Sequence, residues 1–182
     1  MINNILKVLF FAGACLLAYL LYDLFAKEMS YRAERDDIEA QVIKKMEIIK
    51  KAQMNFRDVN GHFTSSFDSL INYMKTGTMK VMVEYGDKND TTNTYRREIK
   101  NILVKDTLFK DVNIDLIGFV PPDEKYMFIM KAGTLRKQDQ DNQVFMVLDP
   151  RPFDRDRANP NHPKDTLQLG SLTEIKFDGN WE

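Results

Sequence analysis

The stretch Val8–Tyr22, which reads VLFFAGACLLAYLLY, contains no charged or strongly polar residue. Beyond Asp23 the apolar run continues through residues 24–26. As a helix, residues 8–26 would span about 28 Å, close to the ~30 Å hydrocarbon core of a bilayer. Asp23 would lie near the far interface, where its carboxylate can reach water. The sequence therefore predicts a single-pass membrane protein that contacts lipid through residues 8–26.

Three alternative interpretations of this segment can be weighed against its residues. A cleaved signal peptide would end in small residues, whereas this run ends in Tyr-Asp-Leu-Phe. A lipoprotein would use Cys15, but the apolar run continues well past it and Ala12 stands where a larger aliphatic residue is usual. A buried core helix is the third possibility, although the run is too uniformly apolar for an amphipathic surface helix. We expect the N-terminus to be retained in the mature protein.

The composition of the chain limits the partners and cross-links that can be expected. The 182 residues carry 26 basic and 27 acidic side chains, a formal net charge of -1. That balance gives no reason to expect a nucleic-acid partner, because a phosphate-binding surface needs a basic excess. The single cysteine leaves no disulfide within the chain and does not identify the compartment. We expect a transmembrane anchor at residues 1–26 and one soluble domain at residues 27–182.

The helical pattern continues beyond the apolar segment, since no Gly or Pro occurs between Ala14 and Asn60. This indicates one helix from Val8 to about Arg57. Its second half has one apolar stripe at helical spacing, with charged residues on the other faces. The stripe consists of Ile38, Val42, Met46, Ile49, Ala52 and Phe56, and the charged faces include Lys44, Lys45, Lys50 and Lys51. We expect Ile38, Val42, Ile49 and Phe56 to be buried against a sheet, and Lys44 and Lys51 to stay exposed.

The remaining chain predicts an α+β fold, with this long helix packed on a small antiparallel sheet. Asn60-Gly61 ends the helix, and a serine cap at Ser65 or Ser66 begins a short second helix. A strand is expected at Met79–Tyr85 and an exposed loop at Gly86–Thr94. The segment Tyr95–Val104 is ambiguous, and its charged residues could lie on one face of a helix. Further strands of a meander are expected at residues 114–120, 126–135, 143–148 and 166–172.

Few residues point to catalysis. His62 comes after the Asn-Gly turn and His162 lies in the loop of residues 159–163, and both are interpreted as exposed turn residues. One cysteine excludes a zinc site of several thiolates, and no Gly-rich phosphate loop or nucleophile elbow occurs. The sequence therefore favours a protein that is not an enzyme and carries no cofactor.

The local sequence around the end of the long helix is informative about family. Residues 48–56 read IIKKAQMNF, Asn60-Gly61-His62-Phe63 come next, and residues 66–70 read SFDSL. This stretch resembles type IV pilins and type II secretion pseudopilins, in which the first helix runs through Ala-Gln, an aromatic residue and Asn-Gly into a short Leu-bearing helix. With the segment at residues 169–172 and the tail at residues 179–182, the whole chain also resembles an uncharacterised family of bacterial single-pass envelope proteins.

The sequence departs from filament pilins at the processing site. Prepilin peptidase cleaves after a Gly that precedes a Phe-Thr-Leu-Ile-Glu-like start, but here Gly13 is followed by Ala-Cys-Leu-Leu-Ala. The glutamate used in filament assembly is absent, and only Lys7 is charged upstream. We therefore expect a pilin-like shape without processing into a filament subunit.

The resemblance also suggests one metal site, because major pseudopilins bind calcium in a late loop. Residues 149–157, DPRPFDRDR, supply the candidate ligands Asp149, Asp154 and Asp156. The alternative is a solvated loop in which the three interspersed arginines neutralise these carboxylates.

Together these features predict a membrane-anchored, pseudopilin-like structural subunit or adaptor of a bacterial secretion, transport or appendage assembly. The expected partners are membrane lipid and envelope proteins, with a homo-oligomer possible. The alternative is a free-standing periplasmic binding or scaffold module that shares the pilin-like shape. Lysine and arginine counts favour a cytoplasmic domain, but large trailing domains translocate largely regardless of such counts. From the resemblance we expect the inner membrane, with the domain in the periplasm.

Overall fold

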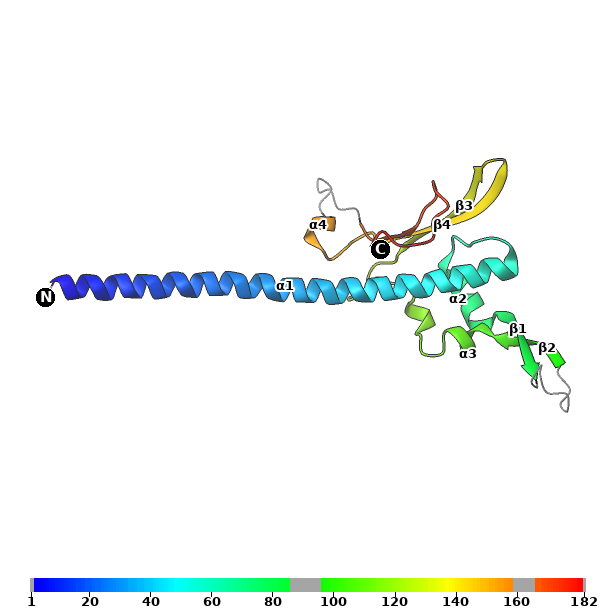
Figure 1. Cartoon of the computed structure of the whole chain (residues 1–182), viewed down its shortest axis with the longest axis horizontal. Helices are drawn as coiled ribbons and strands as arrows, with labels where there is room; N and C mark the ends of the chain where they lie inside the picture. The colour runs from blue at the N-terminus through cyan, green and yellow to red at the C-terminus, as the bar shows by residue number, and fades with distance from the viewer. Residues whose placement is uncertain (1, 86–95, 159–165, 182) are drawn as a thin grey trace. The chain divides into compact units, whose positions relative to one another are not determined.

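The computed structural model describes residues 2–85, 96–158 and 166–181, and its fold is α+β (Figure 1). The predicted loop at Gly86–Thr94 and the residue His162 lie outside the described residues. The helices are α1 (Ile2–Asn60), α2 (Phe67–Thr76), α3 (Val104–Leu108), the 3₁₀ helix η1 (Ile114–Leu116) and α4 (Arg155–Ala158). The strands are β1 (Thr78–Tyr85), β2 (Arg96–Leu103), β3 (Ile129–Lys137), β4 (Gln140–Leu148) and β5 (Gln168–Gly170).

The chain divides into two compact units, residues 1–40 and residues 41–182. The first unit contains the N-terminal part of α1, and the second contains the rest of α1 with all other elements. The predicted division between an anchor at 1–26 and a domain at 27–182 concerns the membrane rather than chain contacts, and it stays a prediction.

Helix α1 is continuous, as the absence of Gly and Pro predicted. It ends at Asn60, and Gly61 comes next with a φ of +80°, a left-handed conformation that glycine adopts without strain. The Gly61 N–H donates to the Arg57 carbonyl at 2.7 Å, which satisfies one of the free carbonyls of the last turn.

The apolar stripe of α1 supplies the core of the second unit. Val42, Met46, Ile49 and Ala52 are each at most 2% exposed. Ile38 is also buried, whereas Lys44 and Lys51 are exposed. These positions confirm the burial and exposure predicted for them.

Phe56 corrects the predicted stripe, because it is half-buried and lies against the aromatic rings of two residues that follow α1 in the chain. Its ring makes edge contacts with Tyr73 of α2 at 5.2 Å and with His62 at 5.7 Å between centroids. Phe56 keeps the helical spacing of the stripe, but it lies in the last turn before α1 ends at Asn60, where its ring is only partly covered. Burial raises the pKa of the Tyr73 hydroxyl, which donates to the Asn55 carbonyl at 3.2 Å.

A buried amide joins α1 to the chain segment after it and to β3. The side chain of Gln53 donates to the Thr64 carbonyl at 2.6 Å and accepts from the Thr64 N–H at 3.1 Å. The same amide nitrogen lies 2.9 Å from the Met130 sulfur. Gln53 is 0% exposed, so these contacts satisfy an amide that water cannot reach.

Two antiparallel sheets replace the one predicted. Strands β3, β4 and β5 form a three-stranded meander in that order, and β1 pairs with β2 in a separate two-stranded sheet. Gln138 and Asp139, with φ of 53° and 58°, make the tight turn between β3 and β4 that such right-twisted hairpins prefer. Gly170 has a φ of +70°, and a Cβ there would collide with the Phe145 carbonyl. Both sheets are antiparallel, as the sequence predicted.

Helix α2 and its cap were correctly predicted, since Ser66 precedes the helix and its hydroxyl accepts from the Ser69 N–H at 3.5 Å. The open choice at Tyr95–Val104 resolves as a strand over Arg96–Leu103, because pairing with β1 outweighs the helical pattern of its charges.

The strand predicted at residues 114–120 is wrong. Ile114, Ile117 and Val120 are the buried side chains, and their three-residue spacing matches a 3₁₀ turn rather than the alternation of a strand. Only Phe119 forms a β-bridge, with Met127.

Candidate functional site

The N-terminal part of α1 exposes a long apolar surface. Its most apolar window has a mean hydropathy of 2.1 and no buried residue, so α1 is long and apolar enough to cross a membrane. Phe10 and Phe11 are 81% and 71% exposed, and Leu16 and Leu17 are 60% and 63% exposed. An apolar surface of this extent is stable in lipid or against another apolar partner, and costly in water.

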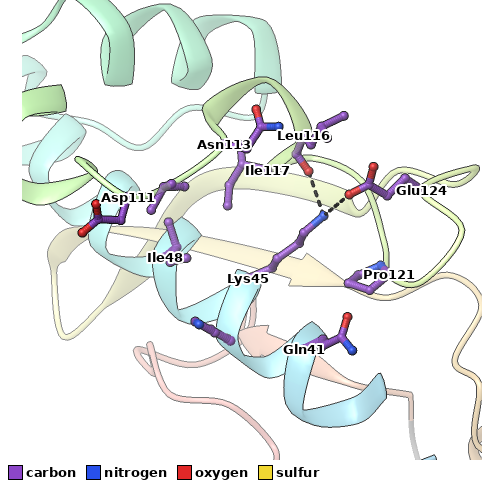
Figure 2. Close-up of a pocket in the computed structure, with 11 residues that line it drawn as sticks. Gln41, Lys45, Ile48, Asp111, Asn113, Leu116, Ile117, Pro121 and Glu124 are labelled. Carbon is purple, nitrogen blue, oxygen red and sulfur yellow. Dashed lines mark hydrogen bonds and ion pairs between the residues drawn. The ribbon is translucent and has the colours of Figure 1, made fainter. Parts of the chain in front are cut away.

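A groove of about 490 Å³ lies within the second unit, between α1 and the segment at residues 111–124 (Figure 2). Apolar side chains line the groove on both sides, from α1 and from the segment at residues 111–124. The residues that line it are Gln41, Lys44, Lys45, Ile48, Asp111, Val112, Asn113, Leu116, Ile117, Pro121 and Glu124. These residues offer apolar contact, amide hydrogen bonds and charge, without a hydroxyl, thiol or imidazole. The groove is therefore suited to holding an apolar group of a ligand or partner.

Lys45 of α1 contacts the opposite wall of this groove, which is formed by the segment at residues 111–124. Its ammonium donates to the carbonyls of Leu116 at 3.0 Å and Phe119 at 2.9 Å. It also lies 3.1 Å from a carboxylate oxygen of Glu124, completing three contacts, two of which are drawn in Figure 2. An ammonium has three N–H donors, so this arrangement uses all of them. The loop at residues 116–124 is held at a set distance from the helix as a result.

The position of Lys45 corrects the prediction that it lies on a charged, solvated face. Its side chain is only 21% exposed. Lys45 comes three residues after Val42 and four before Ile49, so it falls on the apolar stripe itself. A lysine at stripe spacing is the signal that could have identified it. Gln53, four residues after Ile49, is a second polar residue on the stripe with a structural role.

Lys50 likewise has a partner instead of facing only water. It forms a 2.8 Å ion pair with Asp178, and its side chain is 22% exposed. The hydrogen bond from Lys50 lowers the pKa of the Asp178 carboxyl. This contact ties the C-terminal segment to α1.

No protein-family model, curated protein or solved structure matches this chain. Its function is therefore inferred from the residues themselves.

The predicted calcium ligands are placed by local hydrogen bonds. The Asp149 carboxylate accepts from the Arg151 N–H at 2.9 Å, and the Asp154 carboxylate accepts from the Asp156 N–H at 2.9 Å. Asp149 and Asp154 are buried and Asp156 is exposed. Arg157 lies 4.0 Å from Asp154. These bonds shape the loop as short polar turns do.

Over residues 2–85, 96–158 and 166–181, no three acidic, histidine or cysteine side chains are grouped as metal ligands. The calcium site at Asp149, Asp154 and Asp156 stays a prediction. His62 is exposed, as predicted, and its ring nitrogen lies 3.0 Å from the Asn60 carbonyl.

Replacing Lys45 by methionine is expected to loosen the groove wall while leaving the rest of the core in place. The change removes three charge-assisted contacts but keeps an unbranched side chain only one heavy atom shorter, so we expect a loss of about 1–3 kcal/mol of unfolding free energy. Hydrogen exchange should accelerate at the amides of Val120 and Glu124, which bond to Tyr126 and Val120 within this loop. Lys44→Met, at the exposed neighbouring position, is the matched control. Unchanged exchange in the loop would contradict the role of Lys45.

Proposed function

We propose that this protein is a membrane-anchored structural subunit or adaptor of a bacterial envelope assembly, with a pseudopilin-like organisation. The observation that carries the proposal is that one helix, α1, has an exposed apolar part followed by a part that packs into the core of a domain. Its N-terminal part presents apolar side chains outward in a window without a buried residue, and its C-terminal part supplies Met46, Ile49 and Ala52 to a core.

The N-terminal part of α1 is therefore suited to lipid, and its C-terminal part is suited to the core of a domain in water. Lipid would cover Phe10, Phe11 and their neighbours, because all backbone groups there are already hydrogen-bonded within the helix. No glycine or proline separates this segment from the stripe that packs into the domain. A domain attached through a continuous helix is held near the bilayer surface, where it can meet other membrane proteins.

The chemistry of the domain supports a binding role. The groove beside Lys45 combines apolar walls with amide and charged groups, which is the composition of surfaces that recognise partners by burial and hydrogen bonding. The side of the membrane is inferred from the resemblance: the domain is proposed to lie in the periplasm and the short N-terminus in the cytoplasm.

The test combines topology with capture of partners. A reporter active only outside the cytoplasm, fused after Glu182, should be active, and protease added to spheroplasts should digest the domain. The full chain, extracted from its own membranes in mild detergent, should retain stoichiometric envelope proteins. The control Lys51→Ala, an exposed position that does not line the groove, should retain the same ones. A domain protected until the membrane is breached would contradict the proposed side. Purification as a chain without stoichiometric partners would favour the free-standing binding or scaffold module instead.

A further inference from the structure

Among the described residues, the sheet formed by β1 and β2 has two strands and therefore an unpaired edge on each of them (green in Figure 1). A two-stranded hairpin is marginally stable alone, and an unpaired edge is a template for another strand. Natural proteins usually protect such edges with like charges, proline or bulges. The side chains along each edge decide whether a second copy would be repelled or could pair with it.

Strand β1 is self-complementary about its centre. It reads TMKVMVEY over Thr78–Tyr85, with no Gly or Pro. An antiparallel copy centred on Met82 would set Met82 against Met82, and Val81 against Val83. Lys80 would face Glu84, and Met79 would face Tyr85. From Met79 to Tyr85, every pair in this register is apolar with apolar or opposite in charge, and each pair occurs twice except the central Met82 pair.

The exposed face of β1 fits this register. Lys80, Met82 and Glu84 lie on one face and are all exposed, with Met82 at 57%. Across the hairpin Met82 lies opposite Ile99, which is 65% exposed, so the two make an apolar pair open to solvent. Pairing of two copies would join these into one apolar row across four strands.

Charge complementarity favours a second copy of this chain over a partner strand that carries only acidic or only basic residues. Glu84 already contacts Arg97 at 2.9 Å within the hairpin, and a partner's Lys80 would place a second cation beside it. Lys80 lies opposite Asn101, and it forms no ion pair with another described residue. A carboxylate on the neighbouring strand would form an ion pair with Lys80, and Glu84 of a second copy lies at that position.

The other open edges lack this property. Strand β2 is a poorer match: self-pairing about Ile99 would set Glu98 against Lys100, but it would also set Arg97 against Asn101 and Arg96 against Ile102, without an acid for either arginine. Strand β3 carries Lys131, Arg136 and Lys137 with no acid, so two copies would repel. Like charges on edges are a means of preventing association, which makes the neutral, self-complementary β1 the exception.

We propose that β1 is a homotypic interaction surface, through which two copies of this chain pair edge to edge in antiparallel register centred on Met82. The resulting sheet has the strand order β2-β1-β1-β2 across the two chains. This inference goes beyond the proposed function and does not depend on which side of the membrane the domain occupies.

Cysteine cross-linking of the full chain in its membranes tests both the pairing and the register. In a Cys15→Ser background, Met82→Cys should form a disulfide-linked dimer, because opposed residues have Cβ atoms about 4.5–5.5 Å apart. Lys80→Cys and Glu84→Cys should each fail to cross-link when expressed singly, since four residues of offset separate equal positions by about 13 Å. Chains carrying Lys80→Cys should cross-link to chains carrying Glu84→Cys.

Charge reversal supplies a second readout. Adding Lys80→Glu to Met82→Cys should lower the dimer yield about tenfold, because two opposite-charge pairs become like-charge pairs. Adding Glu84→Lys and Arg97→Glu together should restore it, with Arg97→Glu keeping the ion pair inside the hairpin. Circular dichroism would verify that each variant is folded. Equal cross-linking at Met82 and Lys80, or a dimer insensitive to Lys80→Glu, would overturn the proposal.

Discussion

Replacing Leu16 and Leu20 by arginine is expected to release the chain from membranes. Both leucines lie in the apolar segment and are 60% and 48% exposed. Each arginine near the centre of a span costs about 2.5–3.5 kcal/mol of insertion free energy, so the pair costs about 5–7 kcal/mol. The measurement is the fraction of protein that stays in the membrane pellet after alkaline carbonate extraction.

The matched control replaces the same two leucines by isoleucine, which preserves their apolar area. The isoleucine variant should stay in the pellet like the unmodified chain. If the arginine variant also resists extraction, residues 8–26 do not span a membrane, and the proposed anchor is wrong. The result does not bear on the pairing of β1, which is measured separately.

Replacing Ile49 by alanine is expected to lower the unfolding free energy by about 3–4 kcal/mol. Ile49 is 0% exposed at the centre of the stripe, and deletion of its methyl groups leaves a cavity that the packed core cannot fill. Phe56→Ala should cost about 2 kcal/mol, since this ring is half-buried against Tyr73 and His62. The measurement is denaturant unfolding of the full chain in detergent, monitored by near-ultraviolet circular dichroism.

Lys51→Ala, two positions away on the exposed face, is the control and should change stability by less than about 0.5 kcal/mol. A loss at Phe56 as large as that at Ile49 would mean that the last turn of α1 packs more tightly than its exposure indicates. A negligible loss at Ile49 would remove the basis for treating the stripe as the core.

Local patterns predicted the elements whose formation depends on neighbours in the chain. The long helix is explained by the absence of Gly and Pro before Asn60, and its end is explained by Gly61. The cap at Ser66 and the alternation of β1 are equally local. Where the pattern was ambiguous, as at Arg96–Leu103, the outcome depended on a partner strand that the segment alone does not reveal.

Helical spacing does not predict the roles of the polar residues that lie on the apolar stripe. Lys45 and Gln53 lie at positions where helical spacing predicts apolar side chains, and their identities alone suggest solvent exposure. Their actual roles depend on carbonyl groups contributed from outside α1, at Leu116 and Phe119 for Lys45 and at Thr64 for Gln53. A buried cation or amide is stable only when distant acceptors are brought to it, so its role is a property of the fold.

By itself, the sequence determined the α+β class, the long helix with its exposed apolar first part, and the buried positions Val42 and Ile49, because helical spacing and uniform apolarity act along the chain. Only the tertiary structure decided that the strands divide into two sheets and that residues 114–120 turn instead of extending. It also decided that Lys45 closes a groove. The physical reason is that each feature depends on contacts with groups outside the segment itself, such as the bonds from Lys45 to the Leu116 and Phe119 carbonyls, and no local pattern specifies which groups will meet.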